Sequence, residues 1–325
     1  MRKEKKFLIC FFTSLATLIL LSIAVMIIIN PRELFPTKFF TPLTDSNLLD
    51  IKLSLLNKLD YEPKIYVLGS STSFRLNTDS IKNTTGKNAF NLAIDNGRAE
   101  DFLVISKILI NDMKKKPEAV IIGLNLFSLK DSDLLPSARI VNKFYIKYLK
   151  IKKAYIIKHY YKTILENLTE SYFKDVARII YYNLTSYPEK NNWDVSETGN
   201  DKRKERQYEE GAYEIYRRGD DKKLSYQEEK LEELASFLDE NNVKIFLFLT
   251  PTHPDTMKKL KADDNYINIY NEAVKFSDKL SRYKNFNFYN FSEIGSFGGT
   301  RSSFSDFTHI GKENSDKIIE KIFKK

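Results

Sequence analysis

The chain has 325 residues, of which 42% are hydrophobic and 13% aromatic, and its formal charge is +9. This composition can form a large buried core and excludes a disordered or collagen-like protein. The single cysteine, Cys10, excludes an intrachain disulfide and a cysteine-based metal site. The three histidines, His159, His253 and His309, are too scattered for a zinc site, so we expect no bound metal.

The N-terminal segment predicts a membrane anchor. Residues 1–6 form a short, mostly basic tail, and residues 7–29 form an apolar run without a charged side chain. This run extends about 35 Å as a helix, enough to cross a bilayer. The tail predicts a cytoplasmic N-terminus and an extracytoplasmic location for everything after Asn30, as in a single-pass protein of the cell membrane. A cleaved signal peptide is the alternative, but the run is longer than usual and no small-residue cleavage site follows it.

An extracytoplasmic location changes the meaning of the positive charge. A basic protein outside the cell is expected to meet anionic lipid or a polyanionic polymer, and nucleic acid is not expected as a partner. After the anchor, residues 30–60 predict a stalk that ends in a short amphipathic helix at 46–59.

Residues 61–325 predict an extracytoplasmic α/β domain, because short apolar strands alternate there with amphipathic helices. This alternation is typical of a three-layer sandwich with a mostly parallel sheet covered on both faces. Ligands in such folds bind beyond the carboxyl ends of the strands. The expected strands are 64–68, 88–93, 119–122, 243–249 and 286–289, and the expected helices are 98–113, 226–241, 265–280 and 313–323.

A segment rich in Lys and Tyr interrupts this alternation at about 134–221. We expect a helical insertion there, followed by a polar loop near 189–209. The insertion is either a solvated helical cap or a basic surface near the membrane that holds an anionic polymer or lipid head groups. The only tryptophan, Trp193, either lines a pocket or packs in this region.

The residues after the first expected strand raise the question of function. The strand ends in Gly69, and four hydroxyl side chains follow at positions 70–73. One interpretation is a simple turn, which Gly and Ser form easily. The other is a strand that presents a serine nucleophile at the edge of the sheet, which requires a base within hydrogen-bond reach.

Two residues just before the last expected helix supply a candidate base and its partner. Asp306 and His309 are three positions apart, in a loop expected at the same edge of the sheet. His309 would accept the serine proton, and Asp306 would fix the tautomer of the imidazole and stabilise its charged form. A capping Asp with a solvated His is the alternative.

The order of these motifs resembles the SGNH (GDSL-type) hydrolase and acyltransferase superfamily. The carriers of the resemblance are Gly69-Ser70-Ser71, Gly123-Leu124-Asn125 and Asp306-x-x-His309. The resemblance covers residues 61–130 and 226–325 and implies a flavodoxin-like α/β fold. It also implies Ser71 as the nucleophile, with Asp306 and His309 completing a catalytic triad and no cofactor. Ser70 stands where many relatives carry Asp, and it is a possible substrate contact.

Further residues resemble the DltD-like branch of extracytoplasmic O-acyltransferases. The stretch Asn88–Ala93 followed by Gly97 carries this resemblance. It implies an oxyanion hole formed by the N–H groups of Ser71 and Gly97 and the side-chain amide of Asn125. Asn125 is alternatively a turn or capping residue. His253, after the fourth expected strand, is a possible substrate contact or a loop histidine without a catalytic role, and His159 is expected on the surface.

The resemblance implies D-alanyl or acetyl transfer to an envelope polymer such as teichoic acid or a polysaccharide, through an acyl-serine intermediate. A membrane-bound O-acyltransferase or an acyl-carrier partner would supply the acyl group. Two alternatives remain open from the residues: an esterase or deacetylase of envelope glycans, and a non-catalytic assembly protein that has kept an SGNH shell.

Overall fold

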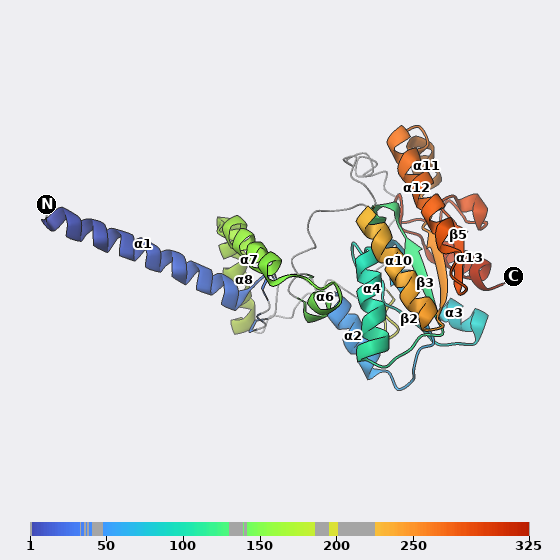
Figure 1. Cartoon of the computed structure of the whole chain (residues 1–325), viewed down its shortest axis with the longest axis horizontal. Helices are drawn as coiled ribbons and strands as arrows, with labels where there is room; N and C mark the ends of the chain where they lie inside the picture. The colour runs from blue at the N-terminus through green and yellow to red at the C-terminus, as the bar shows by residue number, and fades with distance from the viewer. Residues whose placement is uncertain are drawn as a thin grey trace. The chain divides into compact units, whose positions relative to one another are not determined.

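A computed structural model describes residues 2–129 except 33, 36, 38 and 41–47, together with 139, 142–185, 195–200 and 225–324 (Figure 1). The chain divides into two compact units. The first is Met1–Asn47 with Leu134–Asn192, and the second is Leu48–Asp133 with Trp193–Lys325. The predicted stalk is therefore divided at Leu48. Helix α2 (Leu48–Lys58) belongs to the second unit because its leucines are buried there.

The second unit is built on a parallel five-stranded sheet with the order β2-β1-β3-β4-β5. This confirms the predicted α/β class. The order reverses between β1 and β3, which lie side by side although β2 follows β1 in the chain. Such a reversal leaves a crevice beyond the carboxyl ends of the two strands. The strands are β1 Ile65–Gly69, β2 Ala89–Asn91, β3 Ala119–Leu124, β4 Lys244–Leu249 and β5 Phe286–Asn290.

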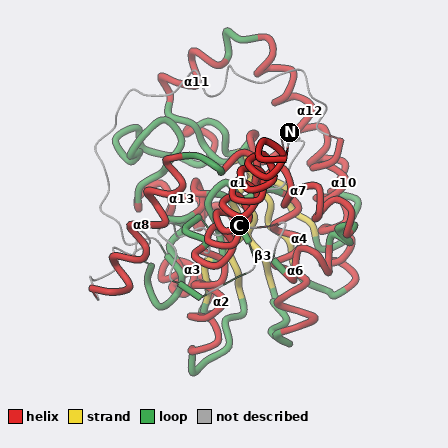
Figure 2. The backbone as a smooth tube through the Cα atoms, turned by 90° about the vertical axis from the view of Figure 1, so that its left-hand side faces the viewer, coloured by secondary structure: helices red, strands yellow, loops and turns green. Residues whose placement is uncertain are grey.

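Helices cover both faces of the sheet. Figure 2 shows the strands running between α3 and α13 on one side and α4 and α10 on the other. Helix α10 also contacts α12, and α4 continues into a π-helical turn at Ile108–Asp112. The bounds are α3 Thr78–Thr85, α4 Ala99–Lys107, α10 Ser225–Glu240, α11 Pro254–Leu260, α12 Asp264–Leu280 and α13 Lys312–Phe323.

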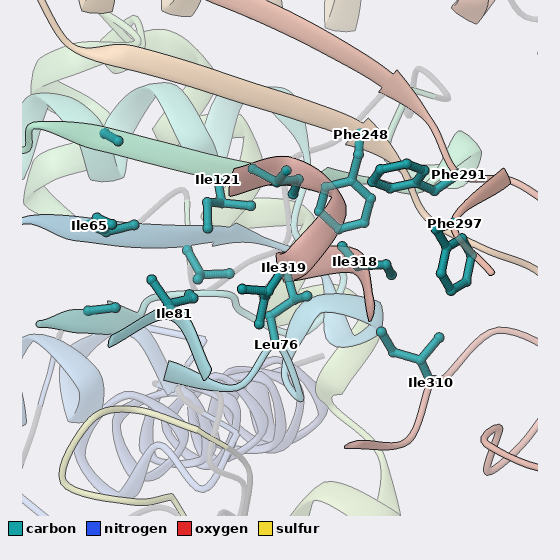
Figure 3. Close-up of a cluster of buried hydrophobic side chains, with 14 of the residues drawn as sticks. Ile65, Leu76, Ile81, Ile121, Phe248, Phe291, Phe297, Ile310, Ile318 and Ile319 are labelled. Atoms are coloured by element: carbon teal, nitrogen blue, oxygen red, sulfur yellow. The ribbon is translucent and has the colours of Figure 1, made fainter. Parts of the chain in front are cut away.

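One hydrophobic cluster fixes α3 and α13 on the sheet. In Figure 3, Ile81 of α3 and Ile319 of α13 lie against Ile65 and Ile121 of the two central strands. Phe248 extends the cluster to β4. Full burial of such side chains contributes about 1.5–3 kcal/mol each. The cluster therefore holds helix α3, which follows β1, and the last helix, α13, on the same face of the sheet.

The structure differs from the sequence predictions at several boundaries. Strands β1 and β3 include Gly69 and Gly123, which were expected to close them. Helices α3 and α11 were not expected. Within the predicted polar loop, residues 195–200 lie beside β2, and the Asn91 N–H donates to the Thr198 carbonyl (2.8 Å). The rest of that loop, including Trp193, lies outside the described residues.

The first unit is helical in its described part. Helix α1 (Arg2–Ile29) is long and apolar enough to cross a membrane, with a mean hydropathy of 2.6 over its best window. The predicted insertion contributes three helices, in agreement with its expected helical character. They are α6 Lys143–Tyr148, α7 Lys153–Asn167 and α8 Glu170–Thr185.

Candidate active site

Ser71 lies at the carboxyl edge of the sheet, two residues beyond β1. It begins a short 3₁₀ turn, Ser71–Ser73, in which the Ser73 N–H donates to the Ser70 carbonyl (2.9 Å) and the Phe74 N–H to the Ser71 carbonyl (3.2 Å). Ser71 is partly exposed, whereas Ser70, Thr72 and Ser73 are buried. The turn therefore presents one hydroxyl of the four to solvent.

Two glycines let this turn fold back onto the sheet. The Ser73 side chain lies over Gly69 and Gly123, which pair in register on β1 and β3. A Cβ at either position would lie 2.2 Å or 2.1 Å from the Ser73 Oγ atom, a distance that no real contact allows. Gly69 also has a φ of +154°, which side-chain-bearing residues rarely adopt. The glycines thus set the height of Ser71 above the strands.

His309 and Asp306 lie in a closed loop before α13. The loop is closed by a bridge between Phe304 and Ile310 and by the Ser305 N–H, which donates to the His309 carbonyl (2.8 Å). Fully buried Asn314 of α13 holds the preceding segment, because its amide donates to the carbonyls of Thr300 (2.9 Å) and Ser303 (2.8 Å).

The loop brings the three predicted side chains into a continuous hydrogen-bonded chain. The Nε2 atom of His309 lies 2.9 Å from the Ser71 Oγ atom, although the two residues are 238 positions apart. The Nδ1 atom of the same ring lies 2.6 Å from the Asp306 Oδ2 atom. With the proton on Nδ1 donated to Asp306, Nε2 is free to accept the proton of Ser71. This is the geometry that a serine nucleophile with a histidine base needs.

The environment of Asp306 keeps its carboxylate charged. Burial raises the pKa of Asp306, but the hydrogen bond from His309, its charge and two backbone N–H groups outweigh burial and lower the pKa to about 2. Those N–H groups belong to Thr308 and His309 and both donate to Oδ1 at 2.8 Å. These contacts favour the ionised form of Asp306, and three hydrogen bonds fix its orientation.

The three predicted oxyanion donors lie near the carboxyl ends of β1 and β3. Asn125 is two residues beyond Gly123, as Ser71 is two beyond Gly69, and these glycines pair in register. The N–H of Ser71, as the first of its turn, has no acceptor within the turn. A Cβ on Gly97 would lie 2.5 Å from the Gly69 carbonyl oxygen, so this backbone approaches the end of β1 closely. The Gly97 N–H donates to the Ile94 carbonyl (3.2 Å) within its own turn, and its role as an oxyanion donor stays a prediction.

The two predicted substrate contacts are buried. The Ser70 hydroxyl lies 2.9 Å from the Thr72 hydroxyl, and the residue is only 6% exposed. His253 is only 3% exposed, and its Nδ1 atom accepts the N–H of Asp255 at the start of α11. Burial lowers the pKa of His253 and favours its neutral form.

His253 supports the loop that carries the candidate base. Its N–H donates to the Phe307 carbonyl (2.8 Å), and its ring makes an edge contact with Phe304. This position fits a structural role better than a substrate contact. The third histidine, His159, was expected on the surface and is partly exposed on α7; its Nε2 atom is 3.3 Å from the Thr163 hydroxyl, and burial lowers its pKa.

Two buried polar residues near the site were not anticipated. The Asn91 amide donates to the carbonyls of Ser73 (2.9 Å) and Phe74 (3.2 Å), so β2 holds the turn that follows Ser71. Lys52 of α2 is 1% exposed; its Nζ atom donates to the Ala93 carbonyl (2.8 Å) and lies over the Phe74 ring. The sequence signal for Lys52 is its place among the apolar positions of an amphipathic helix.

No group of three or more His, Cys, Asp or Glu side chains that could hold a metal ion occurs among the described residues. The chemistry-bearing groups that the structure brings together at this edge of the sheet are a hydroxyl, an imidazole and a carboxylate in sequence.

Comparisons with known proteins find similar structures only. No protein-family profile matches the chain, and no curated protein matches it. Among solved structures, a protein assigned as an acylhydrolase from Bacteroides fragilis and a GDSL-like lipase from Bacteroides thetaiotaomicron are each 10% identical, with a TM-score of 0.38. The matches cover 86% and 85% of this chain and 93% and 95% of those chains. A protein assigned to the lipolytic G-D-S-L family from Desulfitobacterium hafniense is 9% identical, with a TM-score of 0.36 and coverage of 80% and 97%.

Proposed function

We propose that this chain is a membrane-anchored, extracytoplasmic serine O-acyltransferase of the SGNH type that modifies a cell-envelope polymer. The observation that carries the proposal is the hydrogen-bonded chain from Ser71 through His309 to Asp306, with distances of 2.9 Å and 2.6 Å. The proposed acyl group is D-alanyl or acetyl, and the proposed acceptor is a hydroxyl of teichoic acid or a polysaccharide.

The reaction would proceed in two half-reactions at one serine. His309 takes the proton of Ser71 as the Oγ atom attacks the carbonyl carbon of the acyl donor. The tetrahedral intermediate bears a negative oxygen, for which the N–H of Ser71, the N–H of Gly97 and the Asn125 amide are the proposed donors. The carbon–leaving-group bond then breaks, His309 returns its proton to the leaving group, and an acyl-Ser71 ester remains. In the second half-reaction His309 takes the proton of the acceptor hydroxyl as its oxygen attacks the ester carbon; the bond between that carbon and Oγ then breaks, and His309 returns the proton to the Oγ atom of Ser71.

The choice of transfer over hydrolysis depends on the rest of the chain. An apolar N-terminal helix and a basic helical insertion would keep the domain beside membrane-linked polymers and beside a membrane partner that delivers the acyl group. Hydrolysis by the same acyl-enzyme differs only in the acceptor, which would be water.

The test of the nucleophile is covalent labelling of the full-length chain in detergent with a fluorophosphonate probe. We expect labelling of the wild type, its loss in Ser71→Ala, and its retention in Ser70→Ala, whose hydroxyl is buried and bonded to Thr72. Labelling that persists in Ser71→Ala would remove the proposed nucleophile. An unlabelled but folded wild type, even with native membranes added, would favour the non-catalytic alternative.

The test of transfer is a partition experiment. An activated acetyl ester is supplied with increasing concentrations of a polyol or a glycan as acceptor, and acylated acceptor and free acetate are both measured. Transfer predicts that acylated acceptor becomes the main product while the rate of donor consumption is unchanged or rises. Acetate as the only product at every acceptor concentration would identify an esterase instead.

A further inference from the structure

The insertion and the N-terminal helix form one packed unit. Helix α8 lies against the C-terminal end of α1, where Tyr172 and Val176 are buried with Met26. The Tyr172 hydroxyl donates to the Met26 carbonyl at 3.2 Å, and α7 adds Tyr160, whose ring stacks on Phe35. The α7–α8 hairpin (Lys153–Thr185) is therefore attached to α1 by buried apolar contacts, not only by the chain.

Polar contacts fix the hairpin at the point where α1 ends. The Arg32 guanidinium donates to the Asp175 carboxylate (2.8 Å) and to the Ser171 hydroxyl (2.9 Å), both on α8. Asn30 closes the turn after α1, because its amide donates to the carbonyls of Phe35 (2.7 Å) and Thr37 (3.0 Å). The hairpin cannot move away from the end of α1 without breaking these contacts.

This attachment sets the depth of the hairpin in a membrane that α1 crosses. The apolar run ends at Ile29, and Met26 lies about 5 Å inside that end at 1.5 Å per residue. Val25 and Ile27 also pack against the cluster that Met26 forms with Tyr172 and Val176. A helix of about 10 Å diameter that packs at this level lies at the boundary between head groups and hydrocarbon.

The hairpin exposes an apolar stripe that its own unit does not cover. Ile157, Tyr161 and Leu165 of α7 are 68%, 66% and 56% exposed and recur every four residues, so they share one face of the helix. Tyr181 and Leu184 of α8 are 58% and 80% exposed. Large apolar side chains gathered in this way mark a surface that contacts a partner or a membrane.

The positive charge of the insertion indicates that the surface in contact with the stripe is anionic. Residues 142–185 contain nine Lys and Arg against three Asp and Glu, a formal charge of +6 out of +9 for the whole chain. On α7 the exposed side chains of Lys158 and Lys162 are next to the apolar stripe. Apolar and aromatic residues on one face and lysines beside them are typical of a helix that lies in the interface of an anionic bilayer.

We propose that the α7–α8 hairpin is a second membrane attachment, which lies in the outer interface of an anionic bilayer and inserts the stripe of Ile157, Tyr161 and Leu165 among the lipids. Attachment at two places, α1 and the hairpin, prevents this unit from rotating freely about α1. The proposal is independent of the chemistry at Ser71.

The test uses the full-length chain in a Cys10→Ser background, reconstituted alone into vesicles of phosphatidylcholine with phosphatidylglycerol. Single cysteines replace Ile157, Tyr161 and Leu165 in turn and carry a bimane fluorophore. The matched control is Glu166→Cys, because Glu166 is also exposed (61%) and on the same helix but belongs, with its ion-pair partner Lys162, to the charged row beside the stripe and not to the stripe itself. Each site is quenched by a shallow doxyl lipid and, separately, by aqueous iodide.

We expect lipid quenching at the three stripe sites and iodide quenching there at least about threefold weaker than at position 166, as for residues seated in the interface. The contrast should weaken in vesicles of phosphatidylcholine alone. Equal iodide quenching at all four sites would overturn the proposal. Shielding of the stripe in native membranes but not in vesicles would also overturn it, in favour of a protein partner. A contrast that is the same in both lipid compositions would overturn the part that concerns anionic lipid.

Discussion

Replacing Asp306 by Asn tests the central geometry with the smallest change in shape. The amide oxygen of Asn can still accept the two backbone N–H groups at 2.8 Å that now hold Oδ1. The amide nitrogen would then face the Nδ1 atom of His309, where Oδ2 lies now at 2.6 Å. A nitrogen that donates there stabilises the tautomer with its proton on Nε2, which can no longer accept the proton of Ser71.

The structure gives the expected magnitudes. A change of tautomer in a serine protease triad lowers kcat about 10⁴-fold, and we expect a loss of about 10³–10⁴-fold for Asp306→Asn. The pKa of Asp306 is lowered from 3.8 to about 2, which corresponds to about 2 kcal/mol of stability for a fully buried group. Because the side chain is 33% exposed, solvent screening reduces this to about 1 kcal/mol.

The sign of the stability effect follows from the lowered pKa. The folded state binds fewer protons at Asp306 than the unfolded state, so the stabilisation is complete above about pH 4 and is lost as the pH falls towards 2. Asp306→Asn should therefore cost about 1 kcal/mol in urea unfolding at pH 7, and this cost should shrink steadily as the pH falls from about 4 through 2. Asp278→Asn, at an exposed position of α12, is the control.

Fluorophosphonate labelling rates and hydrolysis of an activated ester are the assays for activity. A labelling rate of Asp306→Asn within about tenfold of the wild type would refute the argument, since the tautomer would then not matter. A large loss of activity together with complete unfolding would leave the tautomer undecided, so the urea curve at pH 7 is measured on the same sample. Asp306→Glu provides the second variant, because it keeps the charge while shifting its position.

Three further changes test how the site is supported. Gly123→Ala should destabilise the chain by about 1–3 kcal/mol, because the added methyl group overpacks against Ser73. Adding Ser73→Ala should restore part of that stability in a double-mutant cycle measured by urea unfolding. Additive effects of the two substitutions would contradict the contact between these residues. Burial lowers the pKa of His253 in the folded state, so the wild type should lose stability as the pH falls below about 6.5. In His253→Asn this decrease in stability with falling pH should be smaller. An unchanged dependence of the thermal denaturation midpoint on pH between 5 and 7 would disprove this. Lys52→Met should cost about 1–3 kcal/mol because the Ala93 carbonyl loses its buried donor, and a variant as stable as the wild type in urea would show that this bond contributes nothing.

The parts of the fold that follow from local pattern could be predicted from the sequence. Strand β4 is a run of apolar residues whose burial needs no knowledge of its neighbours, and its predicted range, 243–249, differs by one residue from the observed one. The meeting of Ser71 and His309 at one edge was also predictable, because parallel strands end at the same edge and the last helix returns to it. The distance of 2.9 Å between them was not, because no local pattern encodes it.

The missed elements depend on few or distant contacts. Helix α3 buries Thr78 and Ile81, and its bounds are set by the caps Asn77 and Gly86, a signal that its polar sequence obscured. Helix α11 begins with His253 as its cap and a proline in the first turn, and a proline at that position is a recognisable signal of a helix start.

Gly123 shows a different kind of limit. A glycine at the end of an apolar run indicates a strand end. The Ser73 side chain fills the space that a Cβ on Gly123 would need, and no sequence pattern predicts this contact. The same holds for residues 195–200 beside β2, because backbone hydrogen bonds such as that between Asn91 and Thr198 leave no side-chain pattern.

The support of the candidate triad comes from several separate elements, and this explains how a loop near the end of the chain can position a base against a residue near its start. Helices α3 and α13 are joined by the hydrogen bond from the Asn77 N–H to the Ser315 hydroxyl (2.9 Å) and by that between Ser80 and Asp316. These contacts hold the segment after Ser71 and the segment after His309 as one body.

From the other side, the end of β4 holds the same loop through His253, whose N–H donates to the Phe307 carbonyl (2.8 Å). The backbone near Asp306 is thereby held by hydrogen bonds at Phe307 and, beyond His309, at α13. Without these contacts, the Asp306 side chain, which is 33% exposed, would keep more of its conformational freedom. The loop can thus leave its imidazole and carboxylate partly exposed at the edge of the sheet, while the contacts of Phe307 and of α13 hold the backbone on either side of His309.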